Sequence, residues 1–356
     1  MSREKKILVV GTGTIGEPLI GLLTAYKEQL GIDEVIFHKR TPLLTDRSKV
    51  RALIGRGAKL ATDAERASSF EELEVGTPDY TTEQALEEAS VVIDCTPAGN
   101  QMKEKLYNDF ASNTELFIAQ GSEFGFGKMY ARGINDRALI HGEDKFIQVV
   151  SCNTHNISVL IDTLALFDGQ DNLKQGRFLC VRRSNDLSQD TSFIPSPEVG
   201  KHGDPVFGTH HARDAYHLFK TMGLELDLFS SALKLNTQYM HVIQYHLELN
   251  KKTDLDTILA NIHANDRIAV TYKKTANSVF SFGRDHGFFG RILNQTVIPT
   301  ETLAVIEGGK EVVGYCFTPQ DGNSILSSIA ATLWALYPDS YEEKMQCLSE
   351  WYFQEV

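Results

Sequence analysis

Short apolar runs alternate with longer amphipathic stretches along the first part of the chain. The runs have the length and branched composition of buried strands, and they lie at Lys6–Val10, Glu34–His38, 90–95 and 115–120. Helices are predicted between them at 18–30, Thr82–Glu88 and 102–110, whereas the polar segment 39–73 predicts no single element. Strands that alternate with helices predict an α/β domain of Rossmann type, with a doubly wound parallel sheet.

The pattern changes after residue 152, where strands follow one another with few helices between them. An apolar helix is predicted at 157–167, and strands are predicted at 177–183, 224–235, 240–249, 268–272, 302–306 and 312–317. A polar segment with several histidines lies at 184–214, and helices are predicted again at 324–336 and 341–351. We therefore expect a first domain at 1–151 and a second, α+β domain at 152–320 with a mainly antiparallel sheet.

Composition narrows the class of protein. The chain has 356 residues and a net charge of −12, which disfavours a nucleic-acid partner. The first apolar run is too short for a signal peptide or a membrane span. The five cysteines are scattered without close pairing, which favours a reducing compartment and argues against disulfides and a zinc site. We expect a cytoplasmic protein with no membrane partner.

A glycine-rich turn follows the first strand. Gly11, Gly13 and Gly16, with Thr14 and Ile15 between them, form the Gly-x-Gly-x-x-Gly pattern that cradles a dinucleotide pyrophosphate. The next strand ends not in the usual acidic residue but in Lys39 and Arg40, which favours NADP, or the use of both NADP and NAD. The alternative is a solvated basic turn.

Two further strand ends belong to the same prediction. Thr96 and Pro97 follow one strand, and Gln120 and Gly121 end the next. Loops at the carboxyl ends of parallel strands face the cofactor in such folds, so we expect these residues near it. Without the glycine pattern, each would be an ordinary turn.

Cys152 stands at a predicted junction between a strand and a helix. The free N–H groups and the dipole of a helix N-terminus stabilise a thiolate, the nucleophilic form of cysteine. Its neighbours Ser151, Asn153, Thr154 and His155 are polar, whereas Cys95, Cys180 and Cys316 lie in apolar strands and are interpreted as core residues. Cys152 is therefore the candidate nucleophile.

A nucleophilic thiol needs a proton acceptor, and the candidates are His155, His210, His211 and His241, which sequence alone does not rank. Arg182 and Arg183 end a predicted strand and, with the His210–His211 pair, form a candidate anion pocket. A surface salt-bridging pair is the alternative for the arginines. The histidines lack further ligands in suitable spacing, so no metal is expected.

These motifs, taken in order, resemble glyceraldehyde-3-phosphate dehydrogenase of the archaeal type. The resemblance rests on the glycine-rich turn, on Val-Val-Ser-Cys-Asn-Thr around Cys152, on the Val-Arg-Arg strand end, on the His-His pair and on Met-His at His241. Phe282-Gly283-Arg284-Asp285 and Gln320-Asp321-Gly322-Asn323 add weaker support. The Ser-Cys-Asn-Thr motif is the most specific of these.

The resemblance implies an NAD(P)-dependent, tetrameric enzyme of glycolysis that oxidises a phosphorylated aldehyde through a thiohemiacetal and a thioester. It implies that Cys152 is the nucleophile and His241 the acid–base group, and that Asn323 contacts the nicotinamide. It further implies that substrate or inorganic phosphate is bound around Ser151, Asn153, Thr154, His155, Arg182, Arg183, His210 and His211. The C-terminal segment 321–356 would complete the first domain.

The chain departs from the family beside the nucleophile. The family usually continues with Thr-Gly after Cys-Asn-Thr, but this chain has His155 and Asn156. The departure leaves open whether phosphate or water accepts the acyl group. The alternatives are a semialdehyde dehydrogenase of the same architecture and a non-catalytic nucleotide-binding paralogue.

Overall fold

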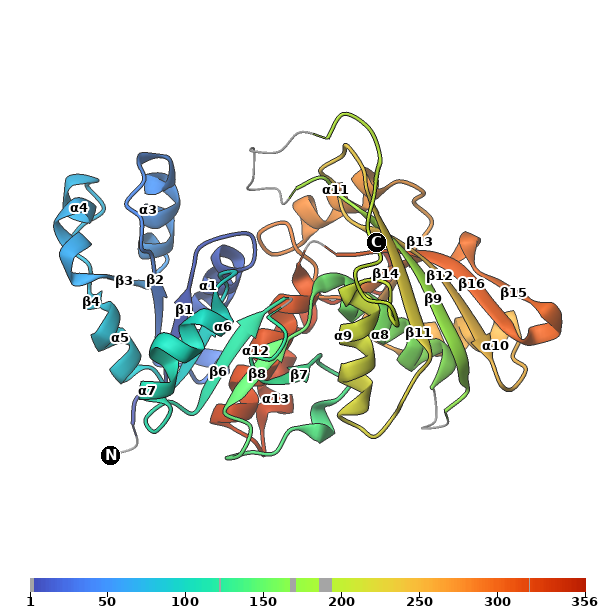
Figure 1. Ribbon diagram of the computed structural model, residues 1–356. Coiled ribbons are helices and arrows are strands. Elements are labelled where there is room, and N and C mark those ends of the chain that lie inside the picture. Colours follow the sequence, from blue (N-terminus) through green and yellow to red (C-terminus); the bar gives the residue numbers. More distant parts are fainter. Residues whose placement is uncertain (1–2, 122, 167–170, 186–193, 320) are drawn as a thin grey trace. The chain divides into compact units, whose positions relative to one another are not determined.

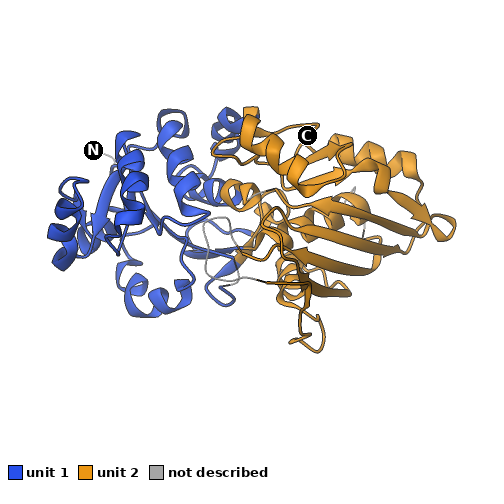
Figure 2. Cartoon of the chain, turned by 90° about the horizontal axis from the view of Figure 1, so that it is seen from above, with its two compact units in different colours: residues 1–128, 139–149, 327–349 blue, residues 129–138, 150–326, 350–356 orange. Residues whose placement is uncertain are grey.

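The computed structural model describes residues 3–121, 123–166, 171–185, 194–319 and 321–356 (Figure 1). The chain divides into two compact units, which Figure 2 distinguishes by colour. The first consists of Met1–Lys128, Leu139–Val149 and Ser327–Ser349, and the second of Met129–Ala138, Val150–Leu326 and Glu350–Val356. The second unit thus includes residues 129–138, 150–151, 321–326 and 350–356, which the sequence led us to expect in the first domain.

The first sheet has eight strands in the order β4-β3-β2-β1-β5-β6-β8-β7, and its pairings from β4 to β8 are parallel. Parallel strands are usually covered on both faces, which explains their almost continuous apolar composition. Leu8, Ile36, Val92 and Phe117 are core residues of this sheet. The strands are β1 (Lys6–Val10), β2 (Glu34–His38), β3 (Lys59–Thr62), β4 (Tyr80–Thr81), β5 (Val91–Asp94), β6 (Leu116–Gln120), β7 (Lys128–Tyr130) and β8 (Phe146–Val149).

Helices connect these strands, as the Rossmann prediction requires. They are α1 (Gly16–Ala25), α2 (Lys27–Leu30), α3 (Arg47–Gly55), α4 (Ala67–Glu72), α5 (Thr82–Glu88), α6 (Gly99–Met102) and α7 (Asn108–Phe110), with a π-helical stretch at Lys103–Tyr107. The helix predicted at 18–30 is therefore divided in two. The polar segment 39–73, which predicted no element, contains α3, β3 and α4 and a 3-10 turn at Leu44–Asp46.

The second sheet also has eight strands, mostly antiparallel, in the order β10-β11-β9-β12-β16-β14-β13, with β15 paired to β16. Only the β11–β9 and β13–β14 pairings among these are parallel. The predicted fold class is thus confirmed for both sheets. The strands are β9 (Leu173–Arg182), β10 (Glu198–Val199), β11 (Leu228–Lys234), β12 (Val242–Leu249), β13 (Ile268–Thr271), β14 (Thr296–Pro299), β15 (Ala304–Ile306) and β16 (Glu311–Phe317).

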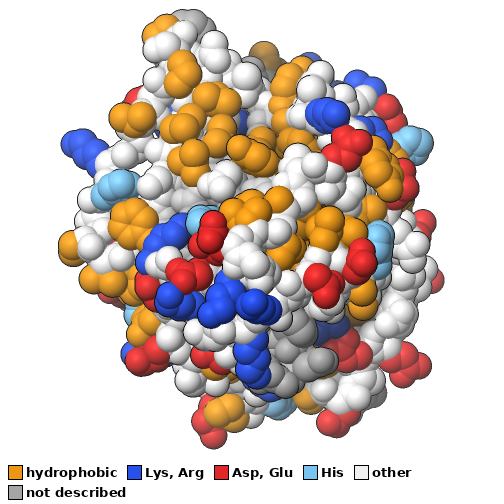
Figure 3. Space-filling view, turned by 90° about the vertical axis from the view of Figure 1, so that its right-hand side faces the viewer, with side chains coloured by type: hydrophobic (Ala, Val, Ile, Leu, Met, Phe, Trp, Pro, Cys, Tyr) orange, Lys and Arg blue, Asp and Glu red, His pale blue; other side chains and the backbone are white. Residues whose placement is uncertain are grey.

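One face of the second sheet is packed and the other is partly open. Residues of β12 alternate, so that Ile243, Tyr245 and Leu247 are buried in the core that also contains Leu160 of α8. Tyr315 on β16 and Tyr272 after β13 are exposed by 47% and 65%. Hydrophobic side chains gather in several patches on the side of the molecule where β15 and β16 lie (Figure 3).

Several helices of the second unit and the C-terminal segment differ from the prediction. They are α8 (Cys152–Ala165), α9 (His210–Lys220), α10 (Leu255–Ala264), α11 (Ala276–His286), α12 (Gly322–Leu336) and α13 (Tyr341–Met345), followed by a 3-10 helix at Gln346–Trp351. The sequence missed α9, α10 and α11, although Asp254 caps α10 by accepting a hydrogen bond from the Thr257 amide at 2.8 Å. The strand predicted at 224–235 begins only at Leu228. No helix in the described ranges is long and apolar enough to cross a membrane.

Candidate active site

The glycine-rich turn between β1 and α1 has the backbone geometry that its sequence predicts. Gly11 adopts φ +95°, and a Cβ at Gly16 would lie 2.1 Å from the Gly11 carbonyl oxygen, so close packing requires glycine at both positions. A Cβ at Gly13, by contrast, would have no atom within 4 Å. The backbone at Gly13 is therefore open to a ligand, which fits the approach of a pyrophosphate.

The neighbouring strand ends support this turn. Thr96 packs on Gly11, with its Cγ2 atom 3.0 Å from the position of a Cβ there, and its amide donates to Asp94 Oδ1 at 2.8 Å. Pro97 follows directly. Gln120 donates through Nε2 to Ser328 Oγ at 2.5 Å, and Gly121 adopts φ +73°. Ser328 belongs to α12, so the C-terminal segment contributes to the first unit.

The basic turn after β2 is paired with acidic side chains. Lys39 Nζ lies 2.6 Å from Asp46 Oδ2, whereas the Arg40 side chain is 74% exposed, with Nε 3.7 Å from Asp63 Oδ2. His38 Nε2 lies 3.1 Å from Thr82 Oγ1. The sequence analysis found the cations but missed Asp46, since that residue falls in the segment that predicted no element.

Cys152 is the first residue of α8, directly after the N-cap Ser151. The Ser151 hydroxyl accepts a hydrogen bond from the Thr154 amide at 3.3 Å, which is the local reason why the helix begins here. Cys152 is partly exposed, whereas Cys180 and Cys316 are buried, and burial raises the pKa of the Cys316 thiol to about 12. Of these three thiols, Cys152 alone combines access with a helix N-terminus.

The first turn of α8 is fixed to the end of β16 by two asparagines. Asn156 Nδ2 donates to the Cys152 carbonyl at 2.7 Å and to Thr318 Oγ1 at 3.1 Å. Thr318 Oγ1 donates to Asn153 Oδ1 at 3.3 Å. Asn323 Nδ2 also donates to the Cys152 carbonyl, at 3.2 Å. The backbone that carries the thiol is thereby held in place.

His155 points into the protein. It is fully buried, its Nδ1 lies 3.1 Å from the Ser151 carbonyl oxygen, and burial lowers its pKa to about 4. At neutral pH the imidazole is uncharged and already engaged with the backbone. The structure therefore gives no support to the interpretation of His155 as a cationic anion binder.

His241 lies immediately before β12 and is positioned by its neighbours in the sheet. Its Nδ1 accepts a hydrogen bond from the Arg183 amide at 3.1 Å, and its carbonyl accepts one from the Thr318 amide at 2.9 Å. Thr318 also contacts Asn153, so hydrogen bonds connect His241 to the residue that follows Cys152. Burial, with the charges of Arg183 and Arg182, lowers the pKa of His241 well below its usual range.

Arg182 lies close enough to His210, His211 and His241 for its charge to lower the pKa of all three, and with Arg183 these residues form one cluster. The rings of His210 and His211 lie 3.9 Å apart at the start of α9, and burial together with Arg182 and Arg213 lowers the pKa of His210 to about 4. Burial above all, with His210, Arg182 and His241 nearby, lowers the pKa of His211 well below its usual range. His211 is 3% exposed, and neither of its ring nitrogens has a hydrogen-bond partner among the described residues.

The arginines of this cluster line a cavity of about 370 Å³. Arg182, Arg183, Thr237, Tyr239 and Met240 are among its lining residues. Arg183 also forms an ion pair of 3.6 Å with Asp321. A buried, polar nitrogen without a partner is costly, so the cluster is suited to a bound anion.

Asp214 is a member of this region that the sequence analysis missed. It is fully buried on α9, it pairs with Arg213 at 2.8 Å, and burial raises its pKa to about 6 against the opposing effect of Arg213. The spacing His210-His211-x-x-Asp214 on one helix was the available signal, because residues three and four apart share a helix face.

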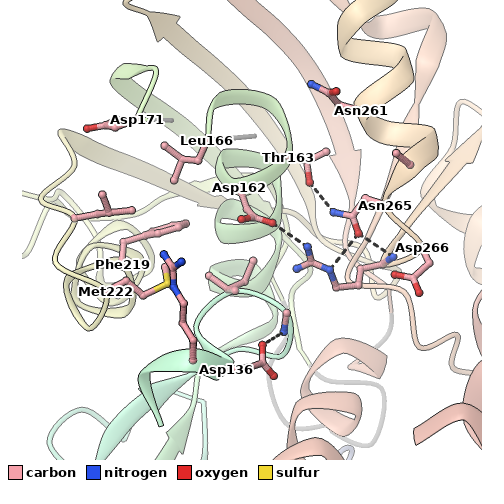
Figure 4. A pocket seen from close by; sticks show the side chains of 16 residues that line it. Asp136, Asp162, Thr163, Leu166, Asp171, Phe219, Met222, Asn261, Asn265 and Asp266 are labelled. Atoms are coloured by element: carbon pink, nitrogen blue, oxygen red, sulfur yellow. Dashed lines mark hydrogen bonds and ion pairs between the residues drawn. The ribbon is translucent and has the colours of Figure 1, made fainter. Parts of the chain in front are cut away.

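A cavity of about 790 Å³ in the second unit lies away from these residues (Figure 4). It is lined by Asp162, Thr163 and Leu166 near the C-terminal end of α8, with Asn265 and Arg267 beside them, and Arg267 donates to Asp162 at 2.8 Å. Asp162 lies ten residues after Cys152, about 15 Å along the helix. None of the predicted site residues lines this cavity, so its size does not identify the site.

Two predictions concern groups that the structure describes only in part. Gln320 of the Gln-Asp-Gly-Asn motif and Phe167 of the predicted helix lie outside the described residues. Within the described ranges, no group of three or more His, Cys, Asp or Glu residues has the arrangement of a metal site.

Comparison with known proteins gives a consistent result. No model of a protein family matches the chain. Glyceraldehyde-3-phosphate dehydrogenase of Methanobrevibacter smithii is 26% identical over 274 residues, covering 75% of this chain and 74% of that protein. The enzymes of the same name from Methanobacterium bryantii and Sulfolobus acidocaldarius are 27% and 25% identical, over 85% and 84% of this chain and 86% and 83% of their own lengths. The predicted resemblance to archaeal proteins of this name is confirmed as a distant one.

Proposed function

We propose that the protein is an NAD(P)-dependent aldehyde dehydrogenase that oxidises a phosphorylated aldehyde of the glyceraldehyde 3-phosphate kind. The observation that carries the proposal is the partly exposed Cys152 at the start of α8, in the same unit as a cationic cluster. The similarity to archaeal glyceraldehyde-3-phosphate dehydrogenases supports the same substrate class. The reaction would have its place in glycolysis.

The residues of the first unit that would hold the cofactor are those of the glycine-rich turn and the adjacent strand ends. Gly13 leaves the backbone accessible, Gly11 and Gly16 allow the close packing of the turn, and Lys39 lies at the position where the 2′ substituent of the adenosine ribose is recognised in this fold. Bound NAD or NADP accepts a hydride. Asn323, beside the Cys152 carbonyl, stays the candidate contact for the nicotinamide amide.

Cys152 forms the covalent bond in this proposal. Its thiolate sulfur adds to the aldehyde carbon, the carbonyl electron pair moves to oxygen, and an alkoxide of the thiohemiacetal results. Loss of hydride from that carbon restores the carbonyl and leaves a thioester on Cys152. The N-terminus of α8 favours the thiolate and stabilises negative charge close to it.

His241 acts on the oxygen of this intermediate. A backbone N–H can only donate, so the hydrogen bond from the Arg183 amide fixes Nδ1 as an acceptor and leaves the proton of the neutral ring on Nε2. In this orientation His241 is a hydrogen-bond donor to the alkoxide. The acid–base role implied by the resemblance therefore takes the form of donation from Nε2, since burial and the two arginines oppose a charged ring.

The substrate phosphate is assigned to Arg182, Arg183, His210 and His211. Arg182 Nε and the single N–H of the neutral His211 ring are donors without a described partner, and no described ion pair joins Arg182 to a carboxylate. An incoming dianion would satisfy these donors and raise the pKa of the imidazoles. Ser151, Asn153 and Thr154 would position the reacting end of the substrate through the first turn of α8.

The acyl acceptor is either inorganic phosphate or water. His155 and Asn156 are both turned to the protein interior, so neither is placed to fill a phosphate site beside the thiol. This arrangement favours phosphate over water as the acyl acceptor, the alternative that the sequence leaves open. Steady-state rates measured against phosphate concentration distinguish the two.

A homo-oligomer, a tetramer by the resemblance, completes the proposal. The open face of the second sheet carries the exposed Tyr272 and Tyr315 around an apolar hollow of about 510 Å³. The patches in Figure 3 lie on this unit. Sedimentation velocity measures the assembly state. The free thiols of the chain suit a reducing, cytoplasmic compartment.

The decisive experiment is a panel of aldehydes, followed by the absorbance of the reduced nicotinamide, with and without phosphate or arsenate. We expect phosphorylated aldehydes to be oxidised fastest, with labelling of Cys152 by iodoacetamide in parallel. Turnover of aspartate semialdehyde instead would favour the alternative dehydrogenase. Dinucleotide binding without any turnover would favour the non-catalytic alternative.

A further inference from the structure

A compact cluster of charges surrounds the glycine-rich turn in the first unit. Asp46, at the end of the 3-10 turn Leu44–Asp46, lies between two lysines. Its Oδ2 is 2.6 Å from Lys39 Nζ and its Oδ1 is 3.3 Å from Lys49 Nζ. The three side chains are only 15%, 20% and 24% exposed for Lys39, Asp46 and Lys49, so solvent screens them little.

Lys49 ties this cluster to the turn itself. It lies on α3, and its Nζ donates to the carbonyl of Thr12, between Gly11 and Gly13, at 3.2 Å. The amide of Gly11 in turn donates to the carbonyl of His38 at 3.2 Å. The cluster therefore lies where the turn meets the end of β2, the place at which a Rossmann fold recognises the adenosine ribose.

The charge of the cluster decides which ribose fits. The usual acidic residue at the end of β2 is absent here, but the Asp46 carboxylate occupies the same neighbourhood and accepts hydrogen bonds. A ribose 2′-hydroxyl can donate to that carboxylate, whereas a 2′-phosphate is repelled by it and competes for its two lysines. Asp46, together with Glu17, whose Oε2 lies 3.9 Å from Lys49 Nζ, offsets the two lysine charges: burial raises the pKa of Asp46, but Lys39 and Lys49 outweigh burial and leave it low.

We propose that Asp46 is the cofactor-selecting residue of this protein, admitting the 2′-hydroxyl of NAD and holding Lys39 and Lys49 away from the 2′-phosphate of NADP. This inference rests on the proposed dinucleotide site. It assigns to Lys39 and Lys49 a latent 2′-phosphate site that the internal carboxylate masks. Arg40, which is exposed and 3.7 Å from Asp63, has a smaller part in it.

The test is isothermal titration calorimetry of the full chain with adenosine 2′,5′-bisphosphate, 5′-AMP, NADP and NAD. We expect Asp46→Asn to tighten binding of the bisphosphate and of NADP, relative to 5′-AMP and NAD, by about tenfold, the value of one charge-assisted hydrogen bond. Lys49→Met should move the same ratio in the opposite direction. Asp79→Asn, which breaks a comparable 3.0 Å pair with Lys59 at another place in the first unit, is the matched control and should leave the ratio unchanged.

Two results would overturn the proposal in different ways. If all four probes bind but Asp46→Asn and Lys49→Met leave the ratio unchanged, Asp46 does not select the cofactor, and the dinucleotide site survives. If no probe binds to the folded wild-type chain, the dinucleotide site and the selection both fail. Thermal unfolding of each variant shows that it is folded, and because the two variants act in opposite directions, the loss of one leaves the other decisive.

Discussion

Cations are handled differently in the two regions that we assign to function. Around the glycine-rich turn, Lys39, Lys49, Arg40 and His38 each lie within ion-pair distance of Asp46 or Asp63. In the arginine–histidine cluster of the second unit, no described ion pair joins Arg182, His210, His211 or His241 to a carboxylate. Arg183 and Arg213 are paired with Asp321 at 3.6 Å and with Asp214 at 2.8 Å. The positive and negative charges of the first region therefore balance within the chain, whereas the second region has an excess of positive charge.

This difference in charge indicates which kind of ligand each region suits. A balanced cluster can discriminate between a neutral and an anionic group, because its carboxylate and its ammonium groups respond oppositely to them. A largely buried cluster with excess positive charge is costly in free energy, and a bound anion reduces that cost. The cluster therefore favours binding of a negatively charged substrate. The same reasoning explains why the histidines of the second region have depressed pKa values: burial and neighbouring cations act together, and no acid opposes them.

The largest effect is expected at the nucleophile. Cys152→Ser should lower kcat/KM for the phosphorylated aldehyde by more than about 10⁴-fold, because the hydroxyl cannot replace a thiolate at neutral pH. Cys347→Ser removes another cysteine that forms no disulfide and serves as the control, with turnover unchanged. Near-normal turnover in Cys152→Ser would exclude covalent catalysis through this residue.

Variants of His241 test whether this side chain donates or accepts a proton in the reaction. Replacement by Ala should lower kcat by about 10²–10⁴-fold. If the role is donation from Nε2, His241→Gln should recover a large part of that loss, since the Gln amide nitrogen occupies the Nε2 position and donates without titrating. Equal losses in Gln and Ala, with an acidic limb in the wild-type pH profile that disappears in both, would instead establish a general base.

Variants of His155 test how the free energy of unfolding depends on the charge of a buried imidazole. Its folded-state pKa of about 4 lies below the usual value of 6.5, so the neutral form is favoured by folding. The resulting stability is complete above pH 6.5 and is lost as the pH falls toward 4, by at most about 3 kcal/mol. Urea unfolding between pH 7.5 and 4.5 should show a smaller loss for His155→Asn than for the wild type.

The matched variant for this measurement lies in the balanced region. His38 has Asp63 at 3.5 Å, which opposes the effect of burial on its pKa, so His38→Asn should change the pH dependence less than His155→Asn. An identical change in both variants would contradict the idea that carboxylates distinguish the two regions.

The smallest effect is expected for a single donor of the anion cluster. Arg182→Gln should raise the KM for the phosphorylated aldehyde by about tenfold, the value of one charged hydrogen bond, with little change in kcat. Arg177→Gln on the same strand is the control, because Arg177 is already paired with Asp227 at 2.9 Å and is half-exposed. An equal rise in KM for an unphosphorylated aldehyde would show that Arg182 does not contact the phosphate.

Features that depend on neighbouring residues could be predicted from the sequence alone. The Gly-x-Gly-x-x-Gly turn follows from positions where a Cβ would collide with backbone, and Ser151 followed by Cys152 identifies a capped helix start, because a cap and its helix are adjacent in sequence. The strands β1, β2, β5 and β6 of the first sheet were predicted from apolar runs of the right length, whereas β3, β4 and β7 were not. These features depend on contacts within a few residues.

Contacts between side chains that are distant in the sequence depend on how the chain folds. The antiparallel pairing of β9 with β12 sets Val242 against Val181 and thereby brings His241 to the Arg183 amide, 58 positions away in the chain. The position of α3 brings Lys49 Nζ to the carbonyl of Thr12 and sets Asp46 between two lysines. Asp46 and Lys49 both belong to the segment 39–73, for which the sequence predicted no single element. Such contacts depend on strand register and helix placement, which many residues fix together, so no single stretch of sequence reveals the charge around either site.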